Sequence, residues 1–365
     1  MLFIGLFLER IKNVRKTMLS RFNRAVACII AVCSVLVLLP LRGVADDQTM
    51  NFYVTPDFPE SQVEGSASYF DINADPGTTE KLTLTLQNAI DAPVKVAITP
   101  HTAYTNVNGT VEYGKTAETP DSTLVHSLDK LIEAPEPIEL AGKETKTVSL
   151  RLNLPEETFE GFLAGGLRIS EVKEETEEDT SDEEGLAIKN EFAYVIGVVV
   201  SNSRASVRPD LDLIDVFPDQ LNYRNVVSAT LQNGTPTFIN RLEVEASVHR
   251  KGEEDVLYEA KKEQMQMAPN SNFDFPISLN GDRFRGGDYV LNLTARSGEE
   301  EWQWTEEFTI KADEARSLNR DDVTIDSSPN WLLIGSVSCI VLLLAVIVYL
   351  IVQNKKNKHS QGTEE

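Results

Sequence analysis

Three oxygen-bearing side chains at alternate positions, Asp71, Asn73 and Asp75, form the pattern that opens a calcium-binding loop. An EF-hand loop takes oxygen ligands from positions 1, 3 and 5, with a glycine at position 6 and a bidentate glutamate at position 12. Counted from Asp71, position 6 is Pro76 and position 12 is Leu82. Proline cannot adopt the positive φ of that turn, and leucine supplies no ligand. The pattern therefore favours a turn over a calcium site.

The residues that follow predict a turn leading into a strand. Proline pre-sets φ and glycine tolerates positive φ, so Asp75 to Gly77 is typical of a β-turn. Leu82, Leu84 and Leu86 then alternate with polar residues, which is the period of a half-buried strand. We expect the corner of a β-domain at this point.

Other patterns of catalytic or metal-binding residues are scarce. His101, His126 and His249 fall in separate segments without the spacing of zinc ligands. Carboxylates are so numerous that no single pair identifies the two acids that glycoside hydrolysis requires. We expect no catalytic residues, no metal site and no cofactor, and a wall-modifying hydrolase is the less favoured alternative.

Trp302 and Trp304 are the only candidate ligand-binding residues that the sequence offers. They flank Gln303, so on a strand both indoles face the same way. Paired indoles can stack on sugar rings or anchor a protein partner. The alternative, favoured by the alternation, is that they cap the core of their domain.

Both ends of the chain carry membrane signals. Basic residues precede the apolar run Ala25 to Leu41, and small residues end at Ala45, so we expect a signal peptide over 1–45. Met1 and Met18 are both candidate start residues, and an uncleaved anchor is the alternative. Residues 331–352 are apolar and uncharged, long enough to cross a bilayer as one helix. The basic tail 353–365 places the C-terminus in the cytoplasm and the larger part of the chain outside the cell.

Charge and cysteine usage restrict the class of protein further. The chain has 57 Asp and Glu against 34 Lys and Arg, a formal net charge of −23. This excess argues against nucleic acid as a partner and against a chain that lies on anionic lipid. Cys28, Cys33 and Cys339 all lie in the two apolar segments. An exported domain without disulfides relies on its core, which favours a bacterial surface protein.

The region between the two membrane signals predicts an all-β fold of two tandem immunoglobulin-like sandwiches. Short alternating strands separated by turns occupy most of it, with a hairpin expected at Asn108-Gly109 and a helical turn within Asp121 to Ile132. We place the first domain at 46–203, the second at 204–312 and a polar stalk at 313–330. The acidic run Glu171 to Glu184 is expected to be a solvated loop without a core, and its role is open.

Two segments share the tetrapeptide Thr-Leu-Gln-Asn, which hints at an internal repeat. One is "LTLTLQNAIDAPVKVAI", beginning at Leu82, and the other is "VSATLQNGTPTFINRLEVEASV", beginning at Val227. The alternative is that unrelated sandwiches share the same turn residues.

The ordered motifs of both domains resemble the WxL-interacting proteins, membrane-anchored surface proteins of low-GC Gram-positive bacteria. The first domain contributes "NFYVTPDFPESQ", "AYTNVNGTVEY", "PEETFEGFLAGGLRIS" and "FAYVIGVVV", and the second contributes "LQNGTPTFINRLEVEASVHRKG", "MAPNSNFDFPISLNG" and "WQWTEEFTI". The resemblance implies a peptidoglycan-binding domain followed by a host- or matrix-binding domain. It also implies secreted WxL-domain proteins as partners, and it carries over no catalytic residue.

We therefore expect a cell-surface adhesion scaffold that is anchored by a single C-terminal helix. Its partners would be peptidoglycan, secreted WxL-domain proteins and host extracellular matrix, with recognition through sheet edges or loops. A purely structural spacer without a wall ligand is the other alternative. The sequence identifies neither the binding residues nor the oligomeric state.

Overall fold

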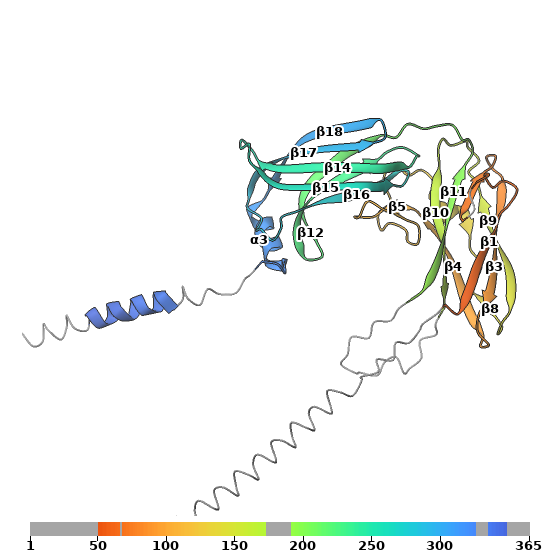
Figure 1. Ribbon diagram of the computed structural model, residues 1–365, viewed down its shortest axis with the longest axis horizontal. Coiled ribbons are helices and arrows are strands. Elements are labelled where there is room, and N and C mark those ends of the chain that lie inside the picture. Colours follow the sequence, from red (N-terminus) through yellow and green to blue (C-terminus); the bar gives the residue numbers. More distant parts are fainter. Residues whose placement is uncertain (1–49, 66–67, 173–190, 326–334, 349–365) are drawn as a thin grey trace, which may run out of the picture. The chain divides into compact units, whose positions relative to one another are not determined.

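The computed structural model describes residues 50–65, 68–172, 191–325 and 335–348 (Figure 1). The expected signal peptide, the ends of the expected membrane helix and nearly all of the acidic loop lie outside these ranges. The described chain is mostly β-structure arranged in several sheets, as the alternating sequence predicts.

Two sheets enclose the first hydrophobic core. One has the order β1-β3-β9-β7, formed by Phe52–Asp57, Thr79–Asn88, Thr145–Asn153 and Ile132–Glu133. The other has the order β2-β11-β10-β4-β8, formed by Phe70–Asn73, Ala193–Ser201, Leu163–Glu171, Val94–Thr102 and Ile138–Leu140. Leu82, Leu84 and Leu86 are each 0% exposed, so the predicted alternation of β3 points them into this core. We call this pair of sheets the first sandwich.

Two further sheets enclose a second, separate core. One has the order β12-β13-β16, formed by Leu211–Leu221, Arg224–Asn233 and Ser271–Ser278. The other has the order β15-β14-β17-β18, formed by Val256–Met267, Ile239–Arg250, Gly287–Ser297 and Glu300–Ile310. All the strand pairs of this second sandwich are antiparallel. Between β11 and β12 the chain has no regular structure over 203–210, close to the expected division.

The predicted turn before β3 is present. Thr78 donates its backbone N–H to the Asp75 carbonyl over 3.3 Å, and Gly77 has φ +71°. Asp71 instead pairs with the guanidinium of Arg204, and Asn73 accepts a hydrogen bond from the Ser201 hydroxyl. The pattern of alternating oxygen ligands is thus used for contacts within the fold.

The shared tetrapeptide has the same structural role in both sandwiches. Asn88 ends β3 and Asn233 ends β13, and both are buried. The Asn88 amide donates to the carbonyl of Ala92 over 2.8 Å, and the Asn233 amide donates to that of Thr237 over 2.7 Å. Each asparagine therefore fixes the backbone four residues on and satisfies carbonyls that would otherwise be buried without partners.

The first part of the expected stalk, 313–330, is helical and packs against the second sandwich. Residues Ala312–Asp321 form helix α3, whose Ala315 is 3% exposed and packs against the second core. Asp322 is also buried and accepts the backbone N–H of Asn225 over 2.7 Å. The polar composition concealed this packing because two apolar side chains, Ala315 and Leu318, and one hydrogen-bonded carboxylate are enough to seat so short a helix. The second folded unit thus extends beyond residue 312.

Residues 335–348, within the expected membrane helix, are helical. Of the helices inside the described ranges, none has both the length and the apolar character that a bilayer crossing needs.

Candidate functional site

The two candidate tryptophans lie on β18 and face the second core. Trp302 is paired with Ala295 and Trp304 with Leu293, and both partners on β17 are buried. Both indoles are partly buried and pack against this core. The structure therefore places both indoles on the core-facing side of the sheet, and their role in binding a ligand stays a prediction.

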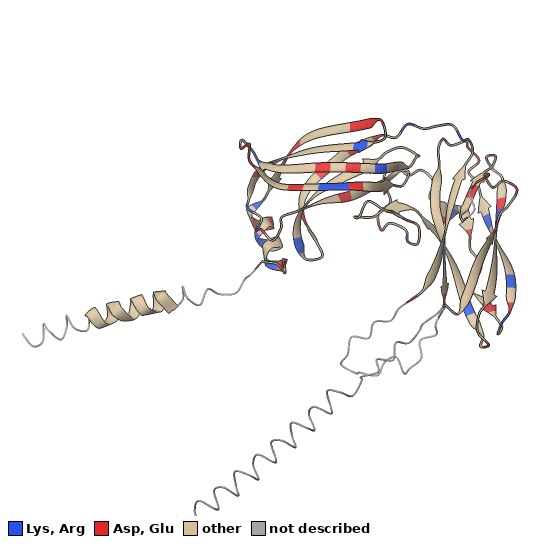
Figure 2. Cartoon of the chain, viewed as in Figure 1, with Lys and Arg blue, Asp and Glu red and all other residues tan. Residues whose placement is uncertain are grey.

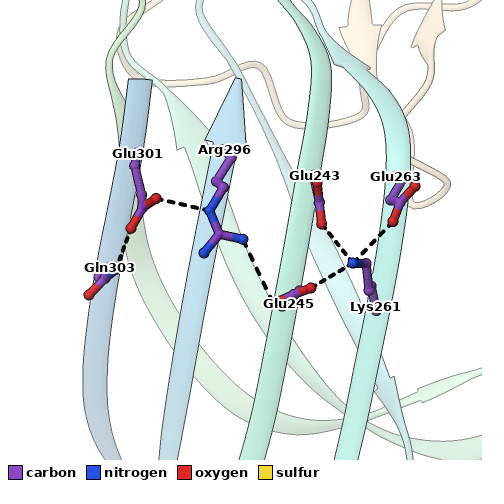
Figure 3. A network of polar contacts seen from close by, with 7 residues as sticks. All are labelled: Glu243, Glu245, Lys261, Glu263, Arg296, Glu301 and Gln303. Atoms are coloured by element: carbon purple, nitrogen blue, oxygen red, sulfur yellow. Dashed lines mark hydrogen bonds and ion pairs between the residues drawn. The ribbon is translucent and has the colours of Figure 1, made fainter. Parts of the chain in front are cut away.

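The opposite face of the same sheet carries a network of ion pairs (Figure 3). Lys261 contacts the carboxylates of Glu243, Glu245 and Glu263 at 2.7–3.1 Å. The hydrogen bonds that the Lys261 ammonium donates to these carboxylates raise the pKa of Lys261. Arg296 extends the network to Glu301 over 2.9 Å. These side chains are solvated, so water and salt screen the attraction between their charges. The network is therefore a charged surface and does not form a binding pocket.

A long excursion from the first sandwich forms a more enclosed site. Residues 103–127, which we call the arm, connect β4 to helix α2 (Leu128–Leu131) and include the short hairpin β5–β6 (Tyr104–Thr105 and Val111–Glu112). Gly109 sits in the turn of this hairpin with φ +60°, as the Asn-Gly pair predicts. Its carbonyl accepts the backbone N–H of Gln266, on β15, over 2.9 Å. The arm therefore reaches the second sandwich.

Hydroxyl groups form the centre of this contact. Thr105 lies 2.6 Å from Ser271, hydroxyl to hydroxyl, and accepts the backbone N–H of Ala268 over 3.0 Å. Thr105 and Ser271 are both buried, so the contact excludes water. Beside it, Phe162 donates its backbone N–H to the carbonyl of Pro236 over 2.7 Å. Buried polar groups that are fully paired in this way fix one arrangement of the arm.

Asp121 is the polar centre of the arm. Its carboxylate accepts the Gln232 amide at 2.9 and 3.1 Å and the Asn272 amide at 2.5 Å, both from the second sandwich. The hydroxyl and backbone N–H of Thr123 also donate to it. Burial by itself would raise the pKa of Asp121, but these hydrogen bonds outweigh it and lower the pKa below its ordinary value.

The hydrogen bonding of Asp121 predicts that the fold loses stability in acid. Because the folded-state pKa of Asp121 lies below that of the unfolded chain, its carboxylate stabilises the fold above about pH 4, and the contribution is lost as pH falls through the folded-state value. Asp121→Asn should remove part of this dependence, since its amide nitrogen cannot accept the Gln232 and Asn272 hydrogen bonds. Asp121→Ala should lower the free energy of unfolding by about 1–3 kcal/mol.

The measurement is urea unfolding of residues 46–325 from about pH 7 to about pH 3. Glu118→Ala, an exposed change in the same arm, is the matched control and should follow the parent protein. An identical acid response in Asp121→Asn and the parent protein would contradict this role.

The arm and the outer face of sheet β12-β13-β16 enclose a pocket of about 580 Å³. Its polar lining includes Asp219, which accepts the Ser228 hydroxyl over 3.0 Å, and Asp274, which accepts the Thr230 hydroxyl over 2.6 Å. Tyr104 supplies an aromatic wall. Its pKa is raised by burial first and then by nearby Glu112 and Glu118, so it stays a neutral phenol.

The chemistry of the lining defines what the pocket can hold. Its acidic side chains outnumber its basic ones, of which Lys115 is the only example in the lining. Carboxylates, amides and hydroxyls beside an aromatic ring are suited to a ligand rich in hydroxyl, amide or ammonium groups, whereas an anion would be repelled. The volume lies within the usual range of small-ligand sites, about 300–1,000 Å³. The pocket is therefore the candidate binding site.

The three histidines within the described residues lie apart from one another. His101 lies 3.1 Å from the Thr116 hydroxyl, and its pKa is lowered by burial and then by Arg168. His126 packs near the ring of Phe159, and His249 contacts Ser247. No group of metal-ligating side chains occurs in the part of the chain that the structure describes.

Sequence reasoning missed the residues of the pocket because they come from distant segments. The available signal was the Asn-Gly turn at 108–109, which correctly predicted a hairpin but not its destination. Asp121 and Asn272 are separated by 151 positions, and nothing in either local pattern shows that they meet.

Two family models match this all-β chain, and they support a cell-surface binding scaffold. Residues 52–171 match the family model for the WxL Interacting Protein peptidoglycan binding domain, and residues 183–320 match that for the WxL Interacting Protein host binding domain. The chain therefore belongs to the WxL Interacting Protein family, as its motifs indicated. Both matched models describe binding domains and not catalytic ones.

Curated proteins give no match to this chain. Among solved structures, the E. coli chaperone DraB is 16% identical and aligns over 71% of this chain and 98% of its own, with a TM-score of 0.26. A structure of the Salmonella enterica SafA pilin with the SafB chaperone matches at 14% identity, 72% and 98% coverage and a TM-score of 0.27. TM-scores this low support no argument about this chain.

The family matches and the hydrogen bonding divide the chain differently at one strand. The host-binding match begins at residue 183 and so includes β11, Ala193–Ser201. In the structure β11 lies between β10 and β2 of the first sandwich and pairs with both. We assign β11 to the first sandwich, because backbone pairing and core packing define a folded unit.

Proposed function

We propose that this protein is a surface scaffold that binds peptidoglycan through its first domain (46–203). The second domain, which we extend from 204–312 to residue 325, would bind a secreted WxL-domain protein or host matrix. Both domains would be immunoglobulin-like sandwiches. A signal peptide over 1–45 would direct export, and a single helix over 331–352 would anchor the chain with its tail in the cytoplasm.

The observation that carries this proposal is the ordered pair of family matches, which together span most of the chain between the two membrane signals. The pocket under the arm supports it, since its lining offers hydrogen-bonding groups and Tyr104 to a polar ligand. The glycan strands and stem peptides of a bacterial wall carry hydroxyl, amide and ammonium groups of this kind. Recognition would be by hydrogen bonds and aromatic contact, with no covalent step.

Co-sedimentation with purified sacculi tests the wall-binding part. The soluble protein should span 46–325 and not stop at 312, because α3 packs on the second sandwich. We expect it to pellet with sacculi, and we expect Tyr104→Ala, in the arm of the first domain, to weaken binding by about fivefold, since a good aromatic contact contributes on the order of 1 kcal/mol. Tyr53→Ala, which removes an exposed tyrosine on β1 outside the pocket, is the matched control.

The possible results separate the alternatives. If the parent protein and the pocket variant pellet equally, the wall is bound elsewhere on the surface. If nothing pellets at any salt concentration, direct wall binding is wrong and the protein is a membrane-held receptor or spacer. Release of muropeptides during the incubation would instead indicate a hydrolase. Loss of a WxL-domain protein from the surface of a deletion strain would exclude a spacer without partners.

A further inference from the structure

Three segments, one of which contains α3, meet at one end of the second sandwich (Figure 1). They are the β12–β13 turn at 222–223 with Arg224 at the start of β13, the loop 279–286, and α3 with the residues that follow it to 325. Asn319 on α3 accepts the backbone N–H of Phe284 over 2.8 Å and donates its amide to the Phe284 carbonyl over 2.9 Å. It also accepts the amide of Asn225 over 2.9 Å. We call this end, formed by the three segments, the base.

Buried polar contacts hold the base as one unit. Asp322 accepts the backbone N–H of Asn225, and its other oxygen accepts the hydroxyl of Thr324 at 2.5 Å. Gln220 donates its amide to the carbonyl of Leu318 over 2.7 Å. The chain leaving the second sandwich is therefore fastened to it as far as residue 325, and the base has a fixed shape.

Two apolar side chains project from the base into solvent. Tyr223 and Val323 are each 70% exposed. Val323 donates its backbone N–H to the carbonyl of Tyr223 over 3.0 Å, so the two residues are neighbours in space. Tyr223 also has φ +58°, a conformation that few non-glycine residues adopt. The fold thus holds a tyrosine and a valine side by side at a solvated tip without packing either of them.

Arginines accompany this tip. Arg224, Arg316 and Arg320 are exposed, and none makes an ion pair with another residue that the structure describes. Figure 2 shows acidic and basic segments together on α3 and a basic segment near the end of the β12–β13 hairpin. The acidic residues of the first turn of α3, Asp313 and Glu314, lie at the other end of the helix, while Arg320 is in its last turn beside exposed Asp321. Unpaired arginines contrast with the acidic character of the chain.

The sequence limits how far the base can lie from the expected membrane helix. Only the five residues Asp326 to Asn330 separate Ile325 from Trp331. Even a fully extended chain covers about 3.3–3.6 Å per residue, so the separation is at most roughly 20 Å. Polar headgroups add to the thickness of a bilayer, roughly 5–8 Å on each side of its hydrocarbon core. The base is therefore within reach of the bilayer surface whenever the helix is inserted.

We propose that the base is a membrane-contacting surface whose partner is the headgroup region of an anionic lipid bilayer. Tyr223 and Val323 enter the interface, where an amphipathic phenol ring is favoured, and Arg224, Arg316 and Arg320 face lipid phosphates. The inference rests on the proposed anchoring by 331–352. Its consequence is that the second sandwich stands on the membrane through a defined face instead of moving freely above it.

Site-specific quenching in vesicles tests this contact. The full chain, with its three cysteines replaced by alanine, is reconstituted with an environment-sensitive fluorophore on Val323→Cys or, as the matched control, on Val125→Cys. Val125 is 82% exposed and lies in the arm. Vesicles of phosphatidylcholine, with and without phosphatidylglycerol, carry a nitroxide quencher on the headgroup. We expect quenching at position 323 and not at 125, strengthened by phosphatidylglycerol.

Three charge variants test the role of the arginines, and a flotation assay separates failure of the anchor from failure of the base to touch the membrane. Arg224→Gln, Arg316→Gln and Arg320→Gln should each weaken the contact in anionic vesicles about fivefold, without preventing flotation of the protein with the vesicles. If the labelled protein does not float, the anchoring by 331–352 is wrong. If it floats but positions 323 and 125 are quenched equally, the base does not touch the membrane and this inference is overturned.

Discussion

A fragment of residues 46–171, which ends where the peptidoglycan-binding match ends, is expected to remain unfolded, whereas 46–203 folds. The difference is β11, the strand that follows the acidic loop. β11 pairs with β10 from Leu163↔Val200 to Ser170↔Ala193 and is also the parallel partner of β2. Without it, β10 loses one complete ladder and β2 loses its strand partner in the sheet.

The free energy lost on removal of β11 is expected to be as large as the stability of a whole domain. Ile196, Val198 and Val200 of β11 are all buried in the first core. Burial of each such side chain contributes about 1.5–3 kcal/mol, or about 5–9 kcal/mol together. A whole domain is typically stable by about 5–15 kcal/mol. Loss of β11 alone therefore removes most or all of the net stability.

Circular dichroism and amide NMR spectra of the two fragments provide the test. Both lack the second sandwich, so any effect of exposing the arm is common to the two and cancels. Dispersed amide signals for 46–203 and collapsed signals for 46–171 are expected. A cooperatively folded 46–171 fragment would show that β11 is dispensable and that the boundary of the family match is the structural one.

Asn233→Ala is expected to lower the free energy of unfolding of the second sandwich by about 2–6 kcal/mol. The Asn233 amide donates to the carbonyls of Thr237 over 2.7 Å and Ala268 over 2.8 Å, and its oxygen accepts the Thr235 hydroxyl over 2.7 Å. Alanine leaves two buried carbonyls without this donor, at a cost of about 1–3 kcal/mol each. Asn88→Ala should have the corresponding effect on the first sandwich.

Tryptophan fluorescence reports on the second sandwich specifically. In residues 46–325 the only tryptophans are Trp302 and Trp304, both on β18. Urea unfolding followed by their emission should show the full destabilisation for Asn233→Ala. Asn292→Ala, an exposed change on the neighbouring strand β17, is the control and should stay within about 0.5 kcal/mol of the parent protein. Equal behaviour of the two variants would mean that Asn233 has no special role.

Patterns within short stretches of the sequence predicted much of the local structure of this protein. Alternating leucines predicted β3 because side chains on a strand point to opposite faces in turn. Asp75 to Gly77 predicted a corner, and Asn108-Gly109 predicted a hairpin, since glycine alone adopts positive φ at little cost. The ordered motifs also identified the family. Each of these signals lies within a short stretch of chain, where local sterics and hydrophobic period act.

The places where these elements meet follow from the folded chain and not from local patterns. The tertiary structure brings Asp121 to Asn272, seats α3 beneath β12 and β13, and buries the face of β18 that carries Trp302 and Trp304. It also inserts β11 between β10 and β2, across the acidic run. Such contacts depend on which surfaces become complementary after the strands have formed. Because a polar side chain looks the same in a sequence whether it faces water or a buried partner, the pocket and the base could not be predicted from residue patterns.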